Sequence, residues 1–190
     1  MKKLNLLIGI FIGMTILSCS SDDDNQNNTP QVESEFIING TEYSISNGFI
    51  ISDFDGTNNS AHTIYLINGT ILNNEWFGEG CDFSNNITQG AIFNIRSSSV
   101  SELAAGTYNY ELFTNEPSLN ETNISTNFVV ENNCIISSND IDEDQINSGS
   151  LTIERSNDIY TLTFSFTTTD FGTVSGNYVG KLQLTQDLSD

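Results

Sequence analysis

The segment around the single tryptophan carries the residue types best suited to binding a ligand. Trp76 and Phe77 are adjacent, with Glu75 before them and Glu79 after them. Sugar rings pack on aromatic faces, and carboxylates accept hydrogen bonds from sugar hydroxyls, so this combination suits a glycan site. The two rings could equally cover an open end of the protein core. The sequence therefore leaves ligand binding and packing as alternatives for this segment.

A second candidate site is a run of alternating acidic residues. Asp140, Asp142 and Asp144 occupy every second position, and Ca²⁺ prefers several oxygen ligands of this kind. The run departs from an EF-hand loop because Gln145 stands where that loop needs glycine. Residues 53–56, Asp-Phe-Asp-Gly, form a weaker candidate. Ca²⁺ is thus the only cofactor that the sequence suggests, and a solvated acidic loop is the alternative.

Nothing in the sequence favours catalysis. His62 is the only histidine, so it has no companion histidine for a metal site, and no serine–histidine–acid set is marked around it. The chain also lacks a Gly-x-Ser-x-Gly motif. Two glycosidase carboxylates are defined by their separation in space, and no pair stands out among the 25 acidic residues. We therefore expect no enzyme activity and a surface position for His62.

The beginning of the chain has the pattern of an export signal. Lys2 and Lys3 precede an apolar segment, residues 4–17, which suits a signal peptide and is too short to cross a bilayer as a helix. A small residue and then Cys19 follow, and residues 20–24 read Ser-Ser-Asp-Asp-Asp. This arrangement resembles the lipobox and the early acidic residues of surface lipoproteins of the Bacteroidetes type.

The resemblance implies where the protein works. Residues 1–18 would be a lipoprotein signal peptide, and Cys19 would be the first residue of the mature protein and carry the lipid. Residues 19–33 are polar and cannot bury enough apolar surface to fold, so they would form a flexible tether. We expect an outer-membrane protein that contacts the membrane through its lipid and faces the cell exterior.

Two cysteines remain once Cys19 is assigned to the lipid. Outside the cytoplasm such a pair usually forms a disulfide, so we expect a bridge between Cys81 and Cys134, with two buried free thiols as the alternative. The formal net charge is −20, from 25 acidic and five basic residues. This charge disfavours nucleic acid and anionic lipid headgroups as partners. It is compatible with divalent cations, with cationic partners or with solubility alone.

Residues 34–190 predict a single all-β domain. Apolar and polar residues alternate strictly from residue 149 to 185, which predicts a C-terminal three-stranded antiparallel meander with Leu182 and Leu184 facing inward. Asn39-Gly40 predicts a hairpin, and residues 100–105 one helical turn. We expect roughly nine to eleven strands, arranged as an antiparallel β-sandwich or as a curled, barrel-like sheet.

The fold gives no activity by itself. Residues 106–113 and 149–184 are similar to segments of uncharacterised small β-domain lipoproteins of the same bacterial group, which supports the fold only. The function we expect is non-catalytic binding of a glycan, a peptide or an envelope protein at the cell surface. A structural accessory subunit of an envelope complex is the alternative, and a polysaccharide-acting enzyme is the third.

Overall fold

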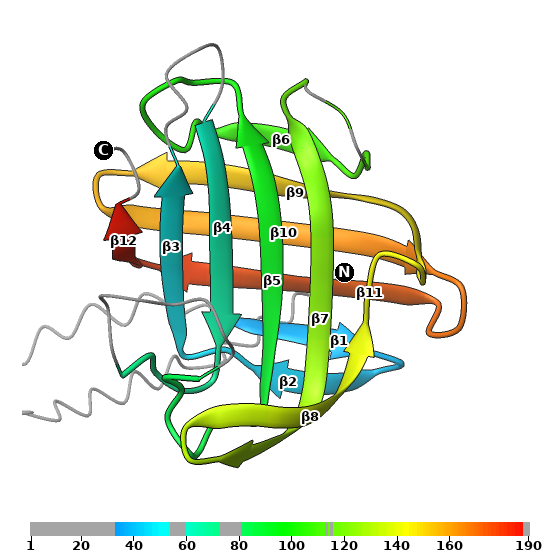
Figure 1. The fold of residues 1–190 in the computed structure, drawn as a ribbon. Helices are drawn as coiled ribbons and strands as arrows, with labels where there is room; N and C mark the ends of the chain where they lie inside the picture. Colours follow the sequence, from blue (N-terminus) through cyan, green and yellow to red (C-terminus); the bar gives the residue numbers. More distant parts are fainter. Residues whose placement is uncertain (1–32, 54–59, 73–80, 113, 115, 188–190) are drawn as a thin grey trace, which may run out of the picture. The chain divides into compact units, whose positions relative to one another are not determined.

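The protein folds as two β-sheets that face each other (Figure 1). The computed structural model describes residues 33–53, 60–72, 81–112, 114 and 116–187, which belong to one compact unit and contain twelve strands and no helix. The all-β prediction is confirmed, with one strand more than the range expected.

The first sheet is antiparallel throughout and has six strands in the order β2-β1-β11-β10-β9-β6. Its strands are β1 (Glu35–Ile38), β2 (Thr41–Ser44), β6 (Gly106–Asn109), β9 (Ile146–Ser156), β10 (Ile159–Thr168) and β11 (Thr173–Gly180). The predicted meander is confirmed as β9-β10-β11. The predicted hairpin joins β1 to β2, and both of its turn residues, Asn39 and Gly40, have the positive φ that a type I′ turn requires.

The second sheet also has six strands, in the order β12-β3-β4-β5-β7-β8. Its strands are β3 (Asn47–Asp53), β4 (Ser60–Ile67), β5 (Gln89–Ser97), β7 (Ser118–Glu131), β8 (Cys134–Ile141) and β12 (Leu182–Asp187). All neighbours are antiparallel except β12 and β3, which are parallel. A purely antiparallel domain was therefore a wrong prediction at this edge.

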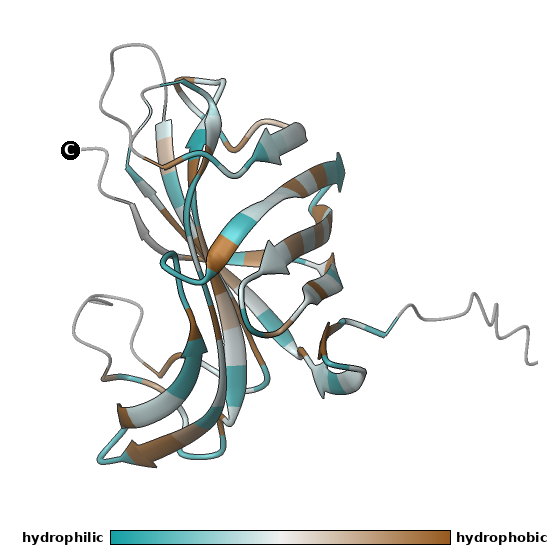
Figure 2. Cartoon of the chain, turned by 90° about the vertical axis from the view of Figure 1, so that its right-hand side faces the viewer, coloured by the Kyte–Doolittle hydropathy of each residue, from teal (hydrophilic) through white to brown (hydrophobic). Residues whose placement is uncertain are grey.

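The main core lies between the sheets, whose strands run crosswise to each other (Figure 1). Phe93 on β5 packs against two rings on β10, with centroid distances of 5.0 Å to Phe164 and 6.2 Å to Phe166. All three side chains are buried because strand alternation points them to the same interior. Seen edge-on, the sheets form two separate layers (Figure 2). Of the two predicted arrangements, the structure is a sandwich.

Two local predictions were wrong. The strand after Val174 does not continue to residue 185, because the chain leaves the first sheet at Gly180 and enters the second as β12. Tyr178 marks this crossing, since its hydroxyl donates to the Lys181 carbonyl oxygen at 2.7 Å. Leu182 packs against the core, whereas Leu184 is 56 % exposed instead of facing inward.

Residues 100–105 form no helical turn. The Ser97 side chain takes over the local backbone groups: its hydroxyl donates to the Glu102 carbonyl oxygen at 2.9 Å and accepts from the Ala104 amide at 3.0 Å. Such side chain–backbone hydrogen bonds offer the chain an alternative to a helix.

Candidate functional site

The face of the second sheet that points away from the core has an apolar cluster of its own. Its buried members come from two strands and from the segment between β4 and β5: Phe49, Ile67, Ile71, Phe83 and Ile87. Tyr65 and three residues of the β7–β8 hairpin pack against them. A sheet face that only met water would be polar at these alternate positions. Among the described residues, the cover on the outer face is therefore concentrated at one end.

The β7–β8 hairpin supplies this cover. Its register shifts between Thr126 and Val130, and Asn127 has φ 55°, as expected for a bulge that bends the strand and increases its twist. The hairpin thereby curls across the end of the sheet (Figure 1). Phe128 and Ile135 consequently lie on the outer cluster rather than in solvent.

A disulfide fastens the β4–β5 segment to this hairpin. Cys81 and Cys134 are bridged, 53 residues apart in sequence, which confirms the predicted pair and rules out two free thiols. The Phe83 amide also donates to the Asn133 carbonyl oxygen at 3.0 Å. The bridge and this hydrogen bond hold one wall of the outer face in place.

A small apolar hollow lies where these parts meet. Its volume is about 20 Å³, and its lining includes the following residues: Tyr65, Ile67, Phe83, Ile92, Phe128 and Ile135. Burial raises the pKa of the Tyr65 hydroxyl above its ordinary value, so this group stays protonated at neutral pH. The hollow thus offers aromatic and aliphatic carbon at the edge of an open sheet face.

Next to the hollow, a strip of hydrogen-bonded polar side chains crosses β4, β5 and β7, with one residue from each strand. Thr63 Oγ1 donates to Asn94 Oδ1 at 2.7 Å, and Asn94 Nδ2 donates to Glu121 Oε2 at 2.8 Å. These residues are direct cross-strand partners, Thr63 with Asn94 and Asn94 with Glu121. The pairing fixes the direction in which the amide and the carboxylate present their remaining hydrogen-bonding positions.

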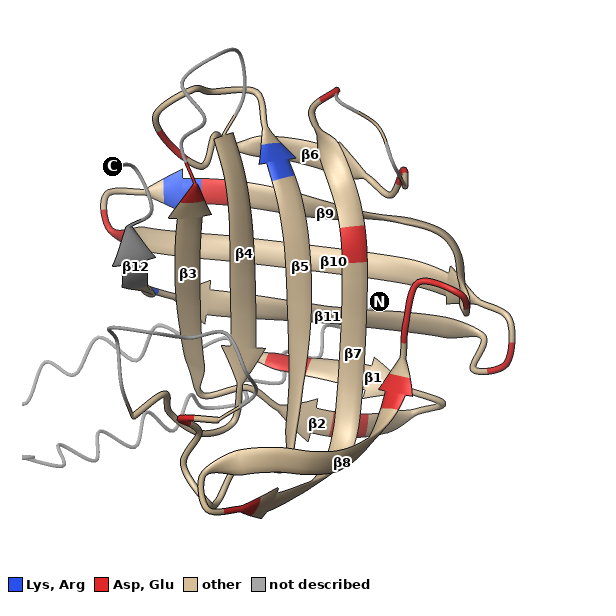
Figure 3. Ribbon diagram, viewed as in Figure 1, with Lys and Arg blue, Asp and Glu red and all other residues tan. Residues whose placement is uncertain are grey.

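The strip ends in a larger cavity beside β7, which we call the acidic cavity. It measures about 350 Å³ and is lined by eight residues: Ile92, Asn94, Glu121, Thr122, Asn123, Asp142, Glu143 and Asp144. Figure 3 shows acidic residues both on β7 and in the turn that follows β8. Ile92 borders this cavity and the apolar hollow alike, so the two adjoin.

The turn between β8 and β9 is tightly built. Asp142 Oδ1 accepts from the Asp144 amide at 3.2 Å, and the Asp142 carbonyl oxygen accepts from the Gln145 amide at 3.0 Å. Tyr110 links the turn to the core. Its hydroxyl donates to the Glu143 carbonyl oxygen at 3.3 Å, and its ring contacts the Phe166 ring edge-on. Burial, and then the nearby carboxylates, raise the pKa of Tyr110 to about 12, so it remains a donor.

The predicted calcium residues do not form one site. Asp140 lines a different cavity of about 270 Å³, together with Tyr43 and Phe171, whereas Asp142 and Asp144 line the acidic cavity. Within the described ranges, no three acidic, histidine or cysteine side chains are close enough to hold a metal ion. Of the weaker candidate, Asp53 is exposed at the end of β3, and residues 54–56 lie outside the described residues.

Several predicted residues lie outside the part of the chain that the structure describes. They are the lipidation residue Cys19 and the four candidate ligand residues Glu75, Trp76, Phe77 and Glu79. Both ends of the tryptophan segment are described: Ile71 pairs with Phe83 in an antiparallel bridge, and both side chains belong to the outer cluster. The two described ends of this segment therefore lie at the outer face of the second sheet.

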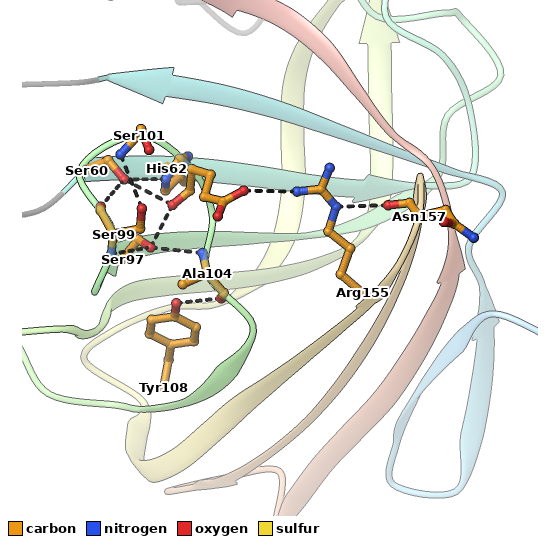
Figure 4. A network of polar contacts seen from close by, with 10 residues as sticks. Ser60, His62, Ser97, Ser99, Ser101, Ala104, Tyr108, Arg155 and Asn157 are labelled. Carbon is orange, nitrogen blue, oxygen red and sulfur yellow. Dashed lines mark hydrogen bonds and ion pairs between the residues drawn. The ribbon is translucent and has the colours of Figure 1, made fainter.

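The prediction that His62 lies on the surface was wrong, because its side chain is only 2 % exposed. Ser52 Oγ lies 2.8 Å from His62 Nδ1. On the other side of the ring, Ser60 Oγ lies 2.7 Å from His62 Nε2 (Figure 4). Ser60 donates its one hydroxyl hydrogen to the Ser99 carbonyl oxygen at 2.8 Å. Nε2 must then donate to Ser60, and Nδ1 accepts from Ser52.

This arrangement stabilises a neutral histidine. Burial lowers the pKa of His62, while the Glu102 carbonyl oxygen acts in the opposite direction with a smaller effect. The loop from Ser97 to Ala104 lies beside the His62 ring (Figure 4). The Glu102 carboxylate of this loop forms an ion pair with Arg155 at 3.3 Å. The network lies where β4 begins and β5 ends, and Ser60, His62 and Ser97 are all buried there.

Sequence analysis did not identify the outer-face residues as a candidate site, although the alternation of polar and apolar residues on β5 contains a signal for one of them. Polar Asn94 alternates with buried Phe93 and Ile95 on β5, which places Asn94 on the outer face. The neighbouring groups, Tyr65 and Glu121, come from strands far away in sequence. Their meeting depends on strand order, which alternation does not encode.

Comparisons with known proteins found no match among protein families, curated proteins or solved structures. Nor do the described residues include a helix with the length and apolar character needed to cross a membrane.

Proposed function

We propose that the protein is a lipid-anchored lipoprotein of the outer membrane, facing the cell exterior, whose sandwich binds a glycan without catalysis. The site would be the open outer face of the second sheet, centred on Tyr65, Ile92, Asn94, Glu121 and Asn123. One observation carries the proposal: an apolar hollow with an aromatic wall directly adjoins an ordered strip of amide and carboxylate groups.

The chemistry of a sugar suits this combination. A pyranose ring has an apolar C–H face that packs on aromatic and aliphatic carbon, and a rim of hydroxyls that pair with amides and carboxylates. Asn94 is held between Thr63 and Glu121 before any ligand arrives. A site already ordered on rigid strands loses little conformational entropy on binding, which favours affinity.

The tryptophan segment fits the same proposal. Its two ends join at the Ile71–Phe83 bridge on the outer cluster. Trp76, Phe77, Glu75 and Glu79 therefore remain candidate ligand residues that would add to the outer-face site.

Titration of the purified protein with a panel of oligosaccharides, followed by calorimetry, tests the proposal. We expect one glycan class to bind, and Asn94→Ala to weaken that binding about tenfold, which corresponds to about 1.4 kcal/mol. Asn109→Ala is the matched control, because this exposed asparagine lies on β6 of the other sheet. Asn109→Ala should melt close to the parent protein because this residue is exposed. Asn94→Ala loses the hydrogen bonds to Thr63 and Glu121, so its binding is measured well below its own melting midpoint.

Two results would contradict the proposal. Glycan binding that is unaffected by Asn94→Ala would place the site elsewhere. A protein that binds no glycan but co-purifies with an envelope complex would support the structural accessory role instead.

A further inference from the structure

We infer that the protein has a second binding site, a cavity between the two sheets that takes one ring of a neutral sugar. This inter-sheet cavity measures about 270 Å³, and six of its lining residues carry the chemistry: Asn39, Tyr43, Thr126, Asn127, Asn139 and Phe171. None of them belongs to the outer-face site, so the second site goes beyond the proposed function.

The β1–β2 hairpin forms one wall of the inter-sheet cavity. In Figure 1 this hairpin lies behind the second sheet, next to β7 and the end of β8. Tyr43 is the cross-strand partner of the core residue Phe36, and such partners point to the same face of a sheet. The two rings also stack, with their centroids 5.1 Å apart. Tyr43 is therefore held with its ring in the space between the sheets.

Strands β7 and β8 form the opposite wall. Thr126 and Asn139 are cross-strand partners, directly before the register of this pair shifts. Thr126 lies two residues after Ile124, and Asn139 two residues before Ile141. Both isoleucines belong to the main core, so strand alternation turns Thr126 and Asn139 toward the first sheet as well. The side chains of both walls thus face the same space.

The Thr126 hydroxyl is the observation that points to a ligand. Thr126 is only 6 % exposed, and the hydrogen bond to its Oγ1, from Asn127 Nδ2, is 3.5 Å long, beyond the usual range of roughly 2.7–3.2 Å. The amide of its cross-strand neighbour Gln89 is engaged elsewhere, by Thr88 and by the Ser44 carbonyl oxygen at 3.1 Å. Buried polar groups are nearly always paired, so a ligand hydroxyl beside Thr126 would satisfy this group.

The rest of the lining matches a sugar ring. Tyr43, Phe171 and two isoleucines of the core offer apolar surface to the C–H face of a pyranose. Asn39 and Asn139 make no side-chain hydrogen bond within the described part of the chain, so their amides are available to sugar hydroxyls. A hydroxyl can donate and accept at once, which suits an amide and a threonine together.

The charge and the size of the cavity define the ligand further. No lysine or arginine lines it. Its one acidic residue, Asp140, lies between Asn139 and Ile141 on β8, so alternation turns the carboxylate to the other face of the sheet. The volume of about 270 Å³ lies just below the range of small-molecule sites, roughly 300–1,000 Å³. One uncharged ring therefore suits the cavity better than an ion or a long oligomer.

Methyl NMR of the purified protein, labelled at its isoleucines, tests the site. The probes are the methyl glycosides of glucose, galactose, mannose and N-acetylglucosamine. We expect one of them to shift the methyl signals of Ile38 and Ile141, because both side chains line the cavity. The methyl signal of Ile92, on the outer face, should stay unchanged at the same concentration.

Two variants identify the binding groups. Asn139→Ala should weaken binding about tenfold, and Thr126→Val, which removes a single hydrogen bond, about fivefold. Asn139 is exposed, and valine keeps the shape of threonine, so both variants should fold like the parent protein. Asn109→Ala is the matched control, and the same methyl glycoside should bind it as tightly as it binds the parent protein.

The outcomes separate this inference from the proposed function. Shifts confined to Ile92, with binding unchanged in Asn139→Ala, would place the sugar on the outer face; the inference would then fail while glycan binding stands. No shift with any methyl glycoside would also overturn the inference, whereas the oligosaccharide titration of Asn94→Ala decides the proposed function. A neutral, end-blocked tripeptide that shifts Ile38 and Ile141 at a lower concentration than any sugar would overturn the sugar assignment.

Discussion

The single histidine shows how one residue can be misjudged from its neighbours in sequence. His62 is preceded by a polar segment, yet strand β4 turns it toward the core, on the same face as Ile64 and Leu66. Burial is tolerated because Ser52 and Ser60 satisfy both ring nitrogens. Such serines could not be identified in advance, since Ser52 reaches His62 only through the β3–β4 pairing.

His62 should make the stability of the protein depend on pH. Its pKa is lower in the folded protein than its ordinary value of 6.5, so the unfolded chain binds more protons. The free energy of unfolding is therefore full above about pH 6.5 and falls as the pH drops below it, by at most about 1.4 kcal/mol per pH unit, until the folded pKa is passed. Urea denaturation at pH 7.5, 6.5 and 5.5 measures this slope.

His62→Gln provides the comparison for this slope. The variant lacks the titrating ring, so its stability should change less between pH 7.5 and 5.5, although its overall stability is lower because two buried serines lose their partner. An identical slope in the parent protein and in His62→Gln would show that other groups cause the pH dependence.

At the scale of elements, local patterns predicted strands well and their neighbours poorly. The meander β9-β10-β11 followed from alternation and turn residues, because each strand pairs with the next along the chain. By contrast, β12 pairs with β3, more than 130 residues earlier in the chain. The alternation of its apolar residues fits a strand in either sheet, so periodicity could not indicate that the chain crosses to the second sheet after Gly180.

The segment held by the disulfide is expected to depend on it strongly. The bridge closes a loop of 53 residues' separation, and the chain-entropy model gives a stabilisation of roughly 4 kcal/mol for a loop of this size. The double variant Cys81→Ser/Cys134→Ser should therefore unfold at a clearly lower urea concentration. It should also bind the glycan less tightly, because Phe83 and Phe128 form one wall of the apolar hollow.

Reduction of the parent protein is the control for this variant. The reduced parent protein and the oxidised double variant should have the same unfolding midpoint. A double variant that loses less than about 1 kcal/mol would mean that the outer cluster holds the loop in place without the bridge.

For the whole molecule, the sequence predicted the all-β class, left a sandwich and a barrel-like sheet as alternatives, and did not indicate the proposed site. The class follows from the alternation of Leu151, Ile153 and their counterparts, which is a local property. The outer-face site combines Tyr65, Asn94 and Glu121 from three strands, and the acidic cavity adds the turn after β8. Even spacing in sequence does not indicate which side chains meet, since Asp140 lines a different cavity from Asp142 and Asp144.

The proposed lipid anchor can be tested on the whole protein in its cell. Because the residues around Cys19 resemble a lipobox, metabolic labelling with radioactive palmitate should mark the protein, and Cys19→Ala should abolish both the label and recovery in the membrane fraction. Two or three acyl chains on one residue make detachment rare, since each buried methylene contributes about 0.8 kcal/mol.

A variant of the acidic residues after Cys19 tests surface exposure separately from lipid anchoring. Replacing Asp22, Asp23 and Asp24 together by asparagine should leave the palmitate label intact and reduce cleavage by protease added to whole cells, because the acidic run would act as the signal for export to the surface. If the protease cleaves this triple variant as fully as the parent protein, the acidic residues are not required for export to the surface. Labelling of Cys19→Ala at the level of the parent protein would show that Cys19 is not the lipidated residue. A cell-surface site for a glycan would then need another means of attachment.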